Sequence, residues 1–339
     1  MQNEIIRPSP LLDEDGRLIQ RGWARRPLLD YNKENIKVGW HRIKEWDFYA
    51  VHDDNFALGY FLADLGYFTL AAISVYNFKE GESYATGGLR LFTRGKIGLS
   101  DSSLEGNTTF KNWMFGEISL ERHPKEHIFH IEASKFKGLQ AEIHLEIDPS
   151  QDAMVVATGY DDSKPNCFYY NHKVNMMPAT GTMEFKGKQI DFSPENAIGN
   201  FDWGRGVWPY KSHWLWGTGG GVVDGHEIWF NIGAGFGDLS THTENMIFVD
   251  GKCHKTDQVE FHPAKKRSGK PWRINSNDER IELQLVPKID SSNYMNIGFM
   301  KTDNNQIHGS YSGKLVLDDG TVLEIADIHG HAEDIHYLW

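Results

Sequence analysis

The segment from residue 201 to residue 216 mixes large aromatic rings with ionisable groups. Its notable side chains are Asp202, Trp203, Arg205, Trp208, Tyr210, His213, Trp214 and Trp216. Aromatic rings bury a large apolar area, and a charge buried among them requires a partner. The combination is typical of a small-molecule cavity with aromatic walls and a few polar groups. The alternative is a structural corner in which Asp202 and Arg205 form an ion pair and the tryptophans fill the core.

Asp202 is the first candidate for a catalytic acid. A carboxyl group among aromatic rings loses hydration, which favours its protonated form and suits general acid catalysis. Arg205 opposes this effect because a nearby cation favours the ionised form. Gly204 and Gly206 flank the arginine and allow the backbone to approach a ligand closely. The sequence leaves the balance between these effects open.

A second candidate group lies at residues 170–173. On a strand, Tyr170 and His172 share one face, and Lys173 lies on the other. His172 is a candidate for relaying a proton to Asp202 or activating water, because histidine titrates near neutral pH. The alternative is a hydrogen-bonded histidine in the core.

Two further clusters contain ligand-type side chains. Glu244 and His242 share a strand face and are candidates for a pocket or a metal site, with a polar outer face as the alternative. His329, His331 and Glu333 offer similar chemistry, but their spacing matches no strong metal signature. We therefore expect neither a metal nor a cofactor.

Alternation of apolar and polar residues predicts an all-β protein. Residues 141–147, 129–133, 227–232 and 314–317 each alternate with period two. Asp-Gly pairs predict hairpins around 224–225, 250–251 and 319–320, because glycine accepts a positive φ. Many short strands with turn signals indicate antiparallel barrels or sandwiches.

The length of 339 residues favours two barrel-like halves over one ordinary barrel. We expect an extended N-terminal arm over 1–35, a first β-barrel-like domain over 36–165 and a second over 166–339. The polar, turn-rich stretch 161–167 marks the expected seam. The glycine-rich run 217–221 is interpreted as a bulge or sharp bend.

Composition excludes several classes of function. There are 47 acidic and 35 basic residues, giving a net charge of −12, which argues against binding to nucleic acid or to an anionic membrane. No apolar run is long enough for a transmembrane helix. The first residues lack the pattern of a signal peptide, and two cysteines are too few for a disulfide framework, so a cytoplasmic location is expected.

Several motifs together resemble a known family. They are Asp15-Gly16, Gly22-Trp23-Ala24-Arg25-Arg26-Pro27-Leu28, Glu45-Trp46-Asp47-Phe48-Tyr49, Asn171-His172-Lys173, Asp202-Trp203-Gly204-Arg205-Gly206-Val207-Trp208-Pro209-Tyr210, Thr243-Glu244-Asn245 and Gly330-His331-Ala332-Glu333-Asp334. The chain is identified by them as a member of the bacterial family catalogued as domain of unknown function 2804. The resemblance runs nearly from end to end.

More distantly, the chain is similar to the lipocalin-like group of carotenoid 1,2-hydratases and tocopherol cyclases. The resemblance implies two consecutive antiparallel barrel-like domains with aromatic cavities. Enzymes of that group protonate an alkene and let water or a hydroxyl capture the cation. This analogy concerns architecture, which alone does not fix function.

The leading hypothesis is a hydratase- or cyclase-like enzyme, a lyase or isomerase, acting on a largely apolar isoprenoid or lipid-like molecule by acid-initiated hydration or cyclisation. Its expected catalytic residues are Asp202, His172 and Glu244. Its expected ligand-binding residues are Tyr170, Lys173, Trp203, Arg205, Trp208, Tyr210, His213, Trp214 and Trp216. Aromatic faces among them would stabilise a developing cation. The alternatives are a lipocalin-like carrier without catalysis and a carbohydrate-active enzyme with paired carboxylates.

Overall fold

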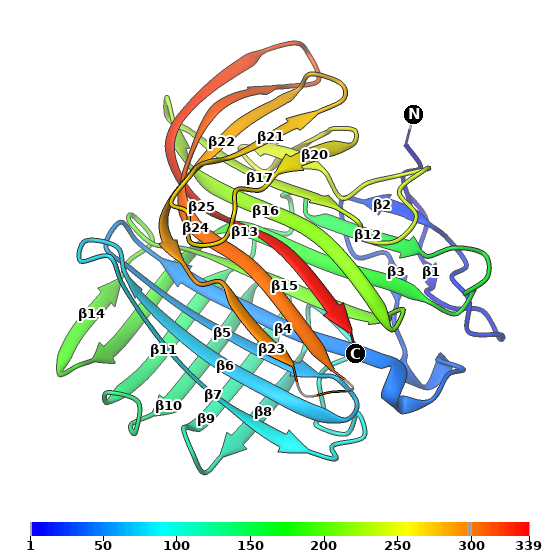
Figure 1. The fold of residues 1–339 in the computed structure, drawn as a ribbon, viewed down its shortest axis with the longest axis horizontal. Helices are drawn as coiled ribbons and strands as arrows, with labels where there is room; N and C mark the ends of the chain where they lie inside the picture. Colours follow the sequence, from blue (N-terminus) through cyan, green and yellow to red (C-terminus); the bar gives the residue numbers. More distant parts are fainter. Residues whose placement is uncertain (1, 297, 299, 339) are drawn as a thin grey trace.

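The computed structural model describes residues 2–338 with the exception of 297 and 299. Within that part, the chain forms β-strands and two single-turn 3-10 helices, Lys33–Asn35 (η1) and Trp40–Arg42 (η2). The strands form two large antiparallel sheets and one two-stranded pair (Figure 1). The prediction of an all-β protein with two barrel-like halves is confirmed.

The first sheet has thirteen strands and curls on itself. Its main path runs β7-β6-β5-β4-β15-β13-β11-β10-β9-β8, while β12 and β14 pair with β13, and β2 pairs with β12. The bounds are β2 Gly22–Ala24, β4 Ile43–His52, β5 Phe56–Asp64, β6 Phe68–Asn77, β7 Glu82–Leu91, β8 Gly106–Asn112, β9 Gly116–His123, β10 Glu126–Ala133, β11 Leu139–Glu146, β12 Met154–Gly159, β13 Phe168–Phe185, β14 Lys188–Phe192 and β15 Ile198–Val207.

The second sheet has ten strands and lies against the first (Figure 1). Its path runs β19-β18-β17-β16-β25-β24-β22-β21-β20, with β23 paired to β24. The bounds are β16 Lys211–Val223, β17 His226–Ala234, β18 Met246–Val249, β19 Lys252–Lys255, β20 Val259–His262, β21 Trp272–Ser276, β22 Ile281–Asp290, β23 Asn293–Asn296, β24 Lys301–Val316 and β25 Val322–Leu338.

The three Asp-Gly hairpins form where the sequence predicts them. Val223 pairs with His226 across Asp224-Gly225, whose two residues have φ values of 51° and 85°. The turn at 250–251 joins β18 to β19 in the same way, with φ values of 46° and 73°. The connection from β24 to β25 is longer, since the last pair before it is Val316 with Val322, and of Asp319 and Gly320 only the glycine has a positive φ. Positive φ at both central residues matches the twist of the flanking strands, which explains the preference for Asp-Gly.

Each sheet encloses its own apolar core. In the first half, Tyr49 and Ile73 from one end of the sheet pack into the same cluster as Leu120 and Phe129 from the other end. The core of the second half gathers residues such as Phe230, Leu283 and Tyr311. A third cluster, which includes Trp208 and Trp229, lies between the two halves. The interiors of both barrel-like halves are therefore filled with side chains.

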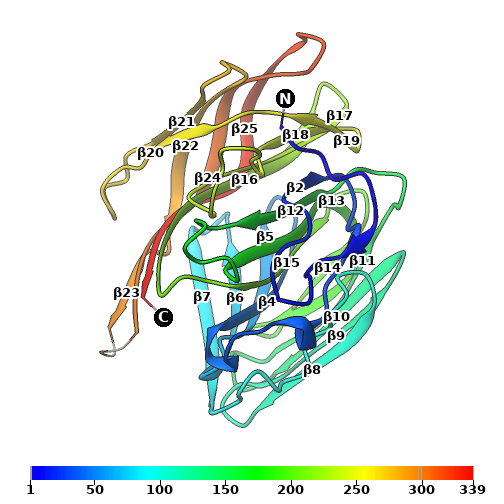
Figure 2. The ribbon, with the colours of Figure 1, turned by 90° about the vertical axis from the view of Figure 1, so that its right-hand side faces the viewer.

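The N-terminal arm lies along the body, as expected, and touches both halves (Figure 2). Its short strands β1 (Ser9–Pro10) and β3 (Leu29–Asp30) pair in parallel, and β2 adds an edge strand beside β12. The backbone N–H of Asn3 donates to the backbone carbonyl of Thr241 in the second half, at 3.0 Å. The arm therefore contacts both halves, through β12 in the first and through the loop between β17 and β18 in the second.

The boundary between the two sheets differs from the expected seam. The turn at 161–167 connects β12 to β13, which pair with each other inside the first sheet. The chain passes to the second sheet only at residues 208–210, between β15 and β16. A polar turn between two strands gives the same sequence signal as a domain boundary, so composition did not distinguish them.

The glycine-rich run 217–221 lies in the regular strand β16, not in a bulge or bend. Gly219 pairs with Gly330 of β25, and the Tyr311 ring packs against both strands at this point. A Cβ atom at Gly330 would lie 2.3 Å from the Thr218 carbonyl oxygen and 2.7 Å from the Tyr311 ring. The glycines therefore leave room for a buried aromatic ring.

Gly330→Ala is expected to lower the free energy of unfolding by about 1–3 kcal/mol, because the added methyl group overpacks this site. Gly221→Ala is the matched control, since its Cβ would meet only ordinary contacts at 3.7 Å and beyond. Urea denaturation of both variants measures the difference. Equal stability of the two would contradict the packing argument.

Candidate active site

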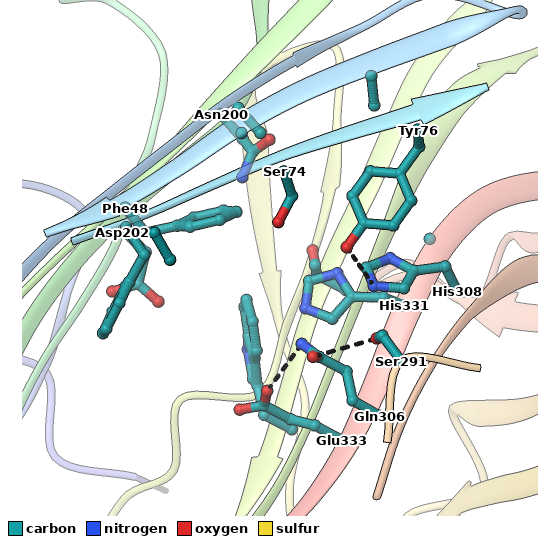
Figure 3. Close-up of a pocket in the computed structure, with 18 of the residues that line it drawn as sticks. Phe48, Ser74, Tyr76, Asn200, Asp202, Ser291, Gln306, His308, His331 and Glu333 are labelled. Atoms are coloured by element: carbon teal, nitrogen blue, oxygen red, sulfur yellow. Dashed lines mark hydrogen bonds between the residues drawn. The ribbon is translucent and has the colours of Figure 1, made fainter. Parts of the chain in front are cut away.

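A cavity of about 590 Å³ lies between the two sheets. The first sheet contributes residues from β4, β5, β6, β13 and β15, and the second contributes residues from β16, β24 and β25. The cavity is thus outside both barrel interiors. Figure 3 shows the polar residues of its wall, among them Tyr76, His308, His331, Gln306 and Glu333.

The segment 201–216 crosses from the first sheet to the second, and its side chains divide among three environments. Asp202, Trp208, Trp214 and Trp216 line the cavity. Trp203 and Arg205 point into the first half, where Trp203 joins the core and the Arg205 guanidinium lies 4.3 Å over its ring. The remaining two, Tyr210 and His213, are exposed. Alternation along β15 explains why Asp202 and Arg205 lie on opposite faces.

Asp202 pairs with Lys173, and the alternative ion pair with Arg205 does not form. The Lys173 Nζ atom lies 3.4 Å from Asp202 Oδ2. Asp202 Oδ1 accepts hydrogen bonds from Trp46 Nε1 at 2.9 Å and from Asn171 Nδ2 at 2.6 Å. These donors and the ammonium group match an ionised carboxylate, which accepts hydrogen bonds only.

Arg205 has partners of its own in the first half. Its Nη2 atom donates to Asp47 Oδ1 at 3.1 Å, and its Nε atom lies 3.7 Å from Glu45 Oε1. The Ser100 carbonyl accepts a further hydrogen bond at 2.7 Å. Arg205 is fully buried, so these contacts supply the partners that its charge requires.

Glu244 joins Lys173 and Asp202 in a buried cluster. Its Oε2 atom lies 3.3 Å from Lys173 Nζ, and the Lys173 ammonium lies 4.4 Å over the Trp216 ring. Burial lowers the pKa of Lys173, but the charges of Asp202 and Glu244 outweigh this, so its pKa is raised. Burial raises the pKa of Glu244. Lys173 is therefore a fixed cation at the cavity wall, between two acidic groups.

His172 and Tyr170 lie on the other face of β13 from Lys173. The His172 ring shares a hydrogen bond of 2.8 Å with Ser103 Oγ, and burial lowers its pKa to about 3. The Tyr170 hydroxyl donates to the Leu29 carbonyl. Both residues are buried in the first half, so the structure does not bring His172 to Asp202.

Glu333 on β25 is a cavity-lining carboxyl group. Its Oε1 atom accepts from Trp214 Nε1 at 2.9 Å, and its Oε2 atom accepts from Gln306 Nε2 at 3.3 Å (Figure 3). Gln306 is in turn held by Ser291, whose hydroxyl donates to Gln306 Oε1. Burial raises the pKa of Glu333 to about 7, although the Trp214 hydrogen bond and the charge of Lys173 oppose the shift. A carboxyl group with this pKa is partly protonated at neutral pH.

A polar group of Tyr76, His308 and His331 lines another part of the wall. The Tyr76 hydroxyl and His308 Nε2 are 3.3 Å apart, and His308 and His331 are cross-strand partners. Burial lowers the pKa of His308 to about 4 and that of His331 to about 3. Both imidazoles are therefore neutral at pH 7.

His213 belongs to a separate surface cluster. Its Nε2 atom is 2.9 Å from Asp334 Oδ1, and its ring stacks on His336 at a centroid distance of 3.9 Å. The ligand-type atoms of these three residues lie within 4.8 Å of one another, so this group could hold a metal ion. Of the C-terminal residues considered for a metal, His329, His331 and Glu333 line the cavity instead.

Sequence reasoning missed several cavity residues. Trp46, Tyr169 and Phe236 complete the aromatic wall, and Gln306 holds Glu333. Trp46 belongs to a motif that carried the family resemblance, and its alternation with Phe48 on β4 was a usable signal. Glu333 was considered only as a metal ligand, because its pairing with Trp214 depends on contacts between β16 and β25.

The fold and the site define a class: an all-β protein of two barrel-like halves with a cavity between them. The chain belongs to the family described as domain of unknown function DUF2804, whose model matches residues 2–339. The family resemblance noted in the sequence is confirmed. No curated protein sequence matches the chain.

Solved structures share the fold. Kievitone hydratase from Nectria haematococca superposes with a TM-score of 0.50 at 11% identity, covering 87% of this chain and 88% of that one. A putative AttH protein from Nitrosomonas europaea gives a TM-score of 0.52 at 15% identity, covering 86% and 92%. At such identities the likeness concerns the fold alone. Among the described residues, the chain has no helix of the length and apolarity needed to cross a membrane.

Proposed function

We propose that this protein is a hydratase- or cyclase-like enzyme that acts on a largely apolar small molecule in the cavity between its sheets. The observation that carries the proposal is Glu333, a carboxyl group whose pKa burial raises to about 7 in a cavity lined by tryptophans. General acids work best when their pKa lies near the working pH. The fold that the chain shares with a hydratase supports this reaction class as an analogy.

In the proposed reaction, Glu333 transfers its proton to a carbon of the ligand's double bond. The faces of Trp214 and Trp216 stabilise the resulting cation. Water then attacks the cation in a hydration, or a hydroxyl group of the same ligand attacks it in a cyclisation. The proton lost from the attacking oxygen returns to the Glu333 carboxylate, so the acid is regenerated.

Asp202 has a positioning role in this proposal, because its contacts match an ionised carboxylate. The Asp202–Lys173–Glu244 cluster fixes a charged group beside Trp216 and so sets the field around Glu333. Asp202 and Glu333 are two carboxyl groups in one cavity, and such a pair is also typical of a carbohydrate-active enzyme. The contacts of Asp202 with Lys173 and Trp46 make it less suited to act on a sugar.

The direct test starts with native mass spectrometry of the freshly purified protein and identification of any co-purified molecule. The identified compound and its relatives are then incubated with the protein and followed by chromatography and mass spectrometry. A product that gains the mass of water, or an isomer with a new ring, supports the proposal. Stoichiometric binding without conversion would instead establish a carrier.

The pH dependence of turnover is expected to follow the protonated form of Glu333. With a pKa of about 7, the acid form predominates below pH 7 and is lost above it. We therefore expect kcat/KM to be halved near pH 7 and to fall about tenfold per pH unit above it. A rate that rises through this range would contradict a general-acid role.

A further inference from the structure

The wall of the cavity is unevenly polar. The tryptophans and Phe236 gather around Lys173 and Asp202, whereas Tyr76, His308 and His331 lie together in another part of the wall. Figure 3 shows these three side chains on one side of the view and Phe48 with Asp202 on the other. The two parts of the wall adjoin at His331 and Trp216, whose rings lie 4.7 Å apart. A ligand that spans both parts therefore meets different chemistry along its length.

The polar group is built from both sheets. Tyr76 comes from β6 of the first sheet, while His308 and His331 come from β24 and β25 of the second. The rings of Tyr76 and His308 lie 4.7 Å apart, and those of His308 and His331 lie 5.4 Å apart. Ser74 and Ser291 also line the cavity and add two hydroxyl groups near Tyr76 (Figure 3).

The His331 ring has spare hydrogen-bonding capacity. Its contacts are an edge-on approach to Trp216 at 4.7 Å and the tilted contact with His308. Among the residues that the structure describes, none shares a hydrogen bond with a ring nitrogen of His331. This half-buried ring lines the cavity, and a ligand that covered it would need to supply the hydrogen-bond partner that buried polar groups normally have. A ligand oxygen placed there would supply the partner.

The polar group is also uncharged. Its imidazoles are neutral because burial lowers their pKa values to about 4 and about 3, and burial raises the pKa of the Tyr76 phenol. A neutral imidazole offers one donor and one acceptor. Such a site hydrogen-bonds to a hydroxyl or carbonyl oxygen, whereas a carboxylate or phosphate would lose hydration without gaining a counter-charge. The two lysines of the cavity wall already have acidic partners: Lys173 lies between Asp202 and Glu244, and Lys288 is paired with Asp327.

We propose that the cavity takes an uncharged, oxygen-bearing ligand in one orientation, with a hydroxyl or carbonyl group at Tyr76, His308 and His331 and an apolar body against Trp214 and Trp216. This inference rests on the proposed function, and it narrows the substrate class. A pure hydrocarbon would leave the polar group without partners, and a fatty acid would bring an uncompensated charge to it.

The test uses three probes with one apolar body: 4-hydroxystilbene, 4-methylstilbene and stilbene-4-carboxylate. Binding is titrated by quenching of the intrinsic tryptophan fluorescence, to which the cavity residues Trp46, Trp208, Trp214 and Trp216 contribute. We expect 4-hydroxystilbene to bind about tenfold more tightly than 4-methylstilbene, the usual scale for leaving buried polar groups without a partner. The carboxylate is expected to bind more weakly still.

Tyr76→Phe removes one hydroxyl group from the polar end and is expected to reduce the preference for 4-hydroxystilbene several-fold. His331→Phe is the second variant, so that the test does not depend on one substitution. Tyr294→Phe is the matched control, since Tyr294 is 58% exposed and outside the cavity wall. Thermal melts confirm that the variants used are folded.

Equal or tighter binding of 4-methylstilbene or of the carboxylate to the wild-type protein overturns the inference, as does the failure of all three probes to bind. An unchanged preference in folded Tyr76→Phe and His331→Phe also overturns it. These are equilibrium measurements without chemistry. Failure of the catalytic proposal would instead appear as a preserved binding preference with no turnover, so the two failures are distinguishable.

Discussion

Glu333→Gln is expected to lower turnover by about 10²–10⁴-fold at neutral pH while leaving ligand binding and stability nearly unchanged. That range is the usual contribution of a positioned general acid. The amide has the shape of the carboxylic acid but cannot deliver a proton. Its oxygen can still accept from Trp214 Nε1. Its NH2 group would meet the Nε2 atom of Gln306, and rotation of the Gln306 amide restores a donor–acceptor match.

Glu324→Gln is the control for this experiment, because Glu324 lies on the same strand but is exposed. It removes the same charge outside the cavity and should retain wild-type turnover. Single-turnover kinetics with the co-purified ligand separate the chemical step from product release. If Glu333→Gln keeps its rate within about twofold of wild type, Glu333 is not the acid.

Lys173→Met is expected to lower the free energy of unfolding by about 3–5 kcal/mol, the usual cost of removing one member of a buried ion pair. Lys173 is 3% exposed and lies between Asp202 and Glu244. Methionine fills much of the same volume, so the loss reports mainly on the two carboxylates that remain without a cation. Denaturant unfolding measures it.

The sign of the pH dependence distinguishes this electrostatic effect from a packing defect. Burial raises the pKa of Glu244, and a protonated Glu244 does not need the ammonium group. The deficit of Lys173→Met should therefore be smaller at about pH 5 than at about pH 8. Adding Glu244→Gln to the variant should recover part of the lost stability. Lys188→Met on β14 is exposed and should change stability by less than about 0.5 kcal/mol. A pH-independent deficit would contradict the charge argument.

The fold could be predicted from local sequence because its signals are local. Alternation within β11 and the Asp-Gly pairs at 224–225 and 250–251 depend only on neighbouring residues. The division between the halves depends on which strands pair over long distances. β13 is 18 residues long and pairs with β11, β12, β14 and β15, which no local pattern reveals.

The candidate site was predicted in part. The segment 201–216 does supply cavity residues, namely Asp202, Trp208, Trp214 and Trp216. Period-two alternation, applied strictly, separates Asp202 from Trp203 and Arg205 on β15. The partners of Asp202 could not be predicted, because Lys173 reaches it through the antiparallel register of β13 with β15. The raised pKa of Glu333 likewise depends on tertiary burial.

The position of the cavity between the sheets has a consequence for how the protein unfolds. Neither half alone carries a complete binding wall. A bound molecule therefore stabilises the association of the two halves more than it stabilises either core. By mass action, saturation at a hundred times the dissociation constant would add about 2.7 kcal/mol to that contact. Halves that unfold separately in the empty protein would then unfold together, and the cooperativity of melting would itself report occupancy.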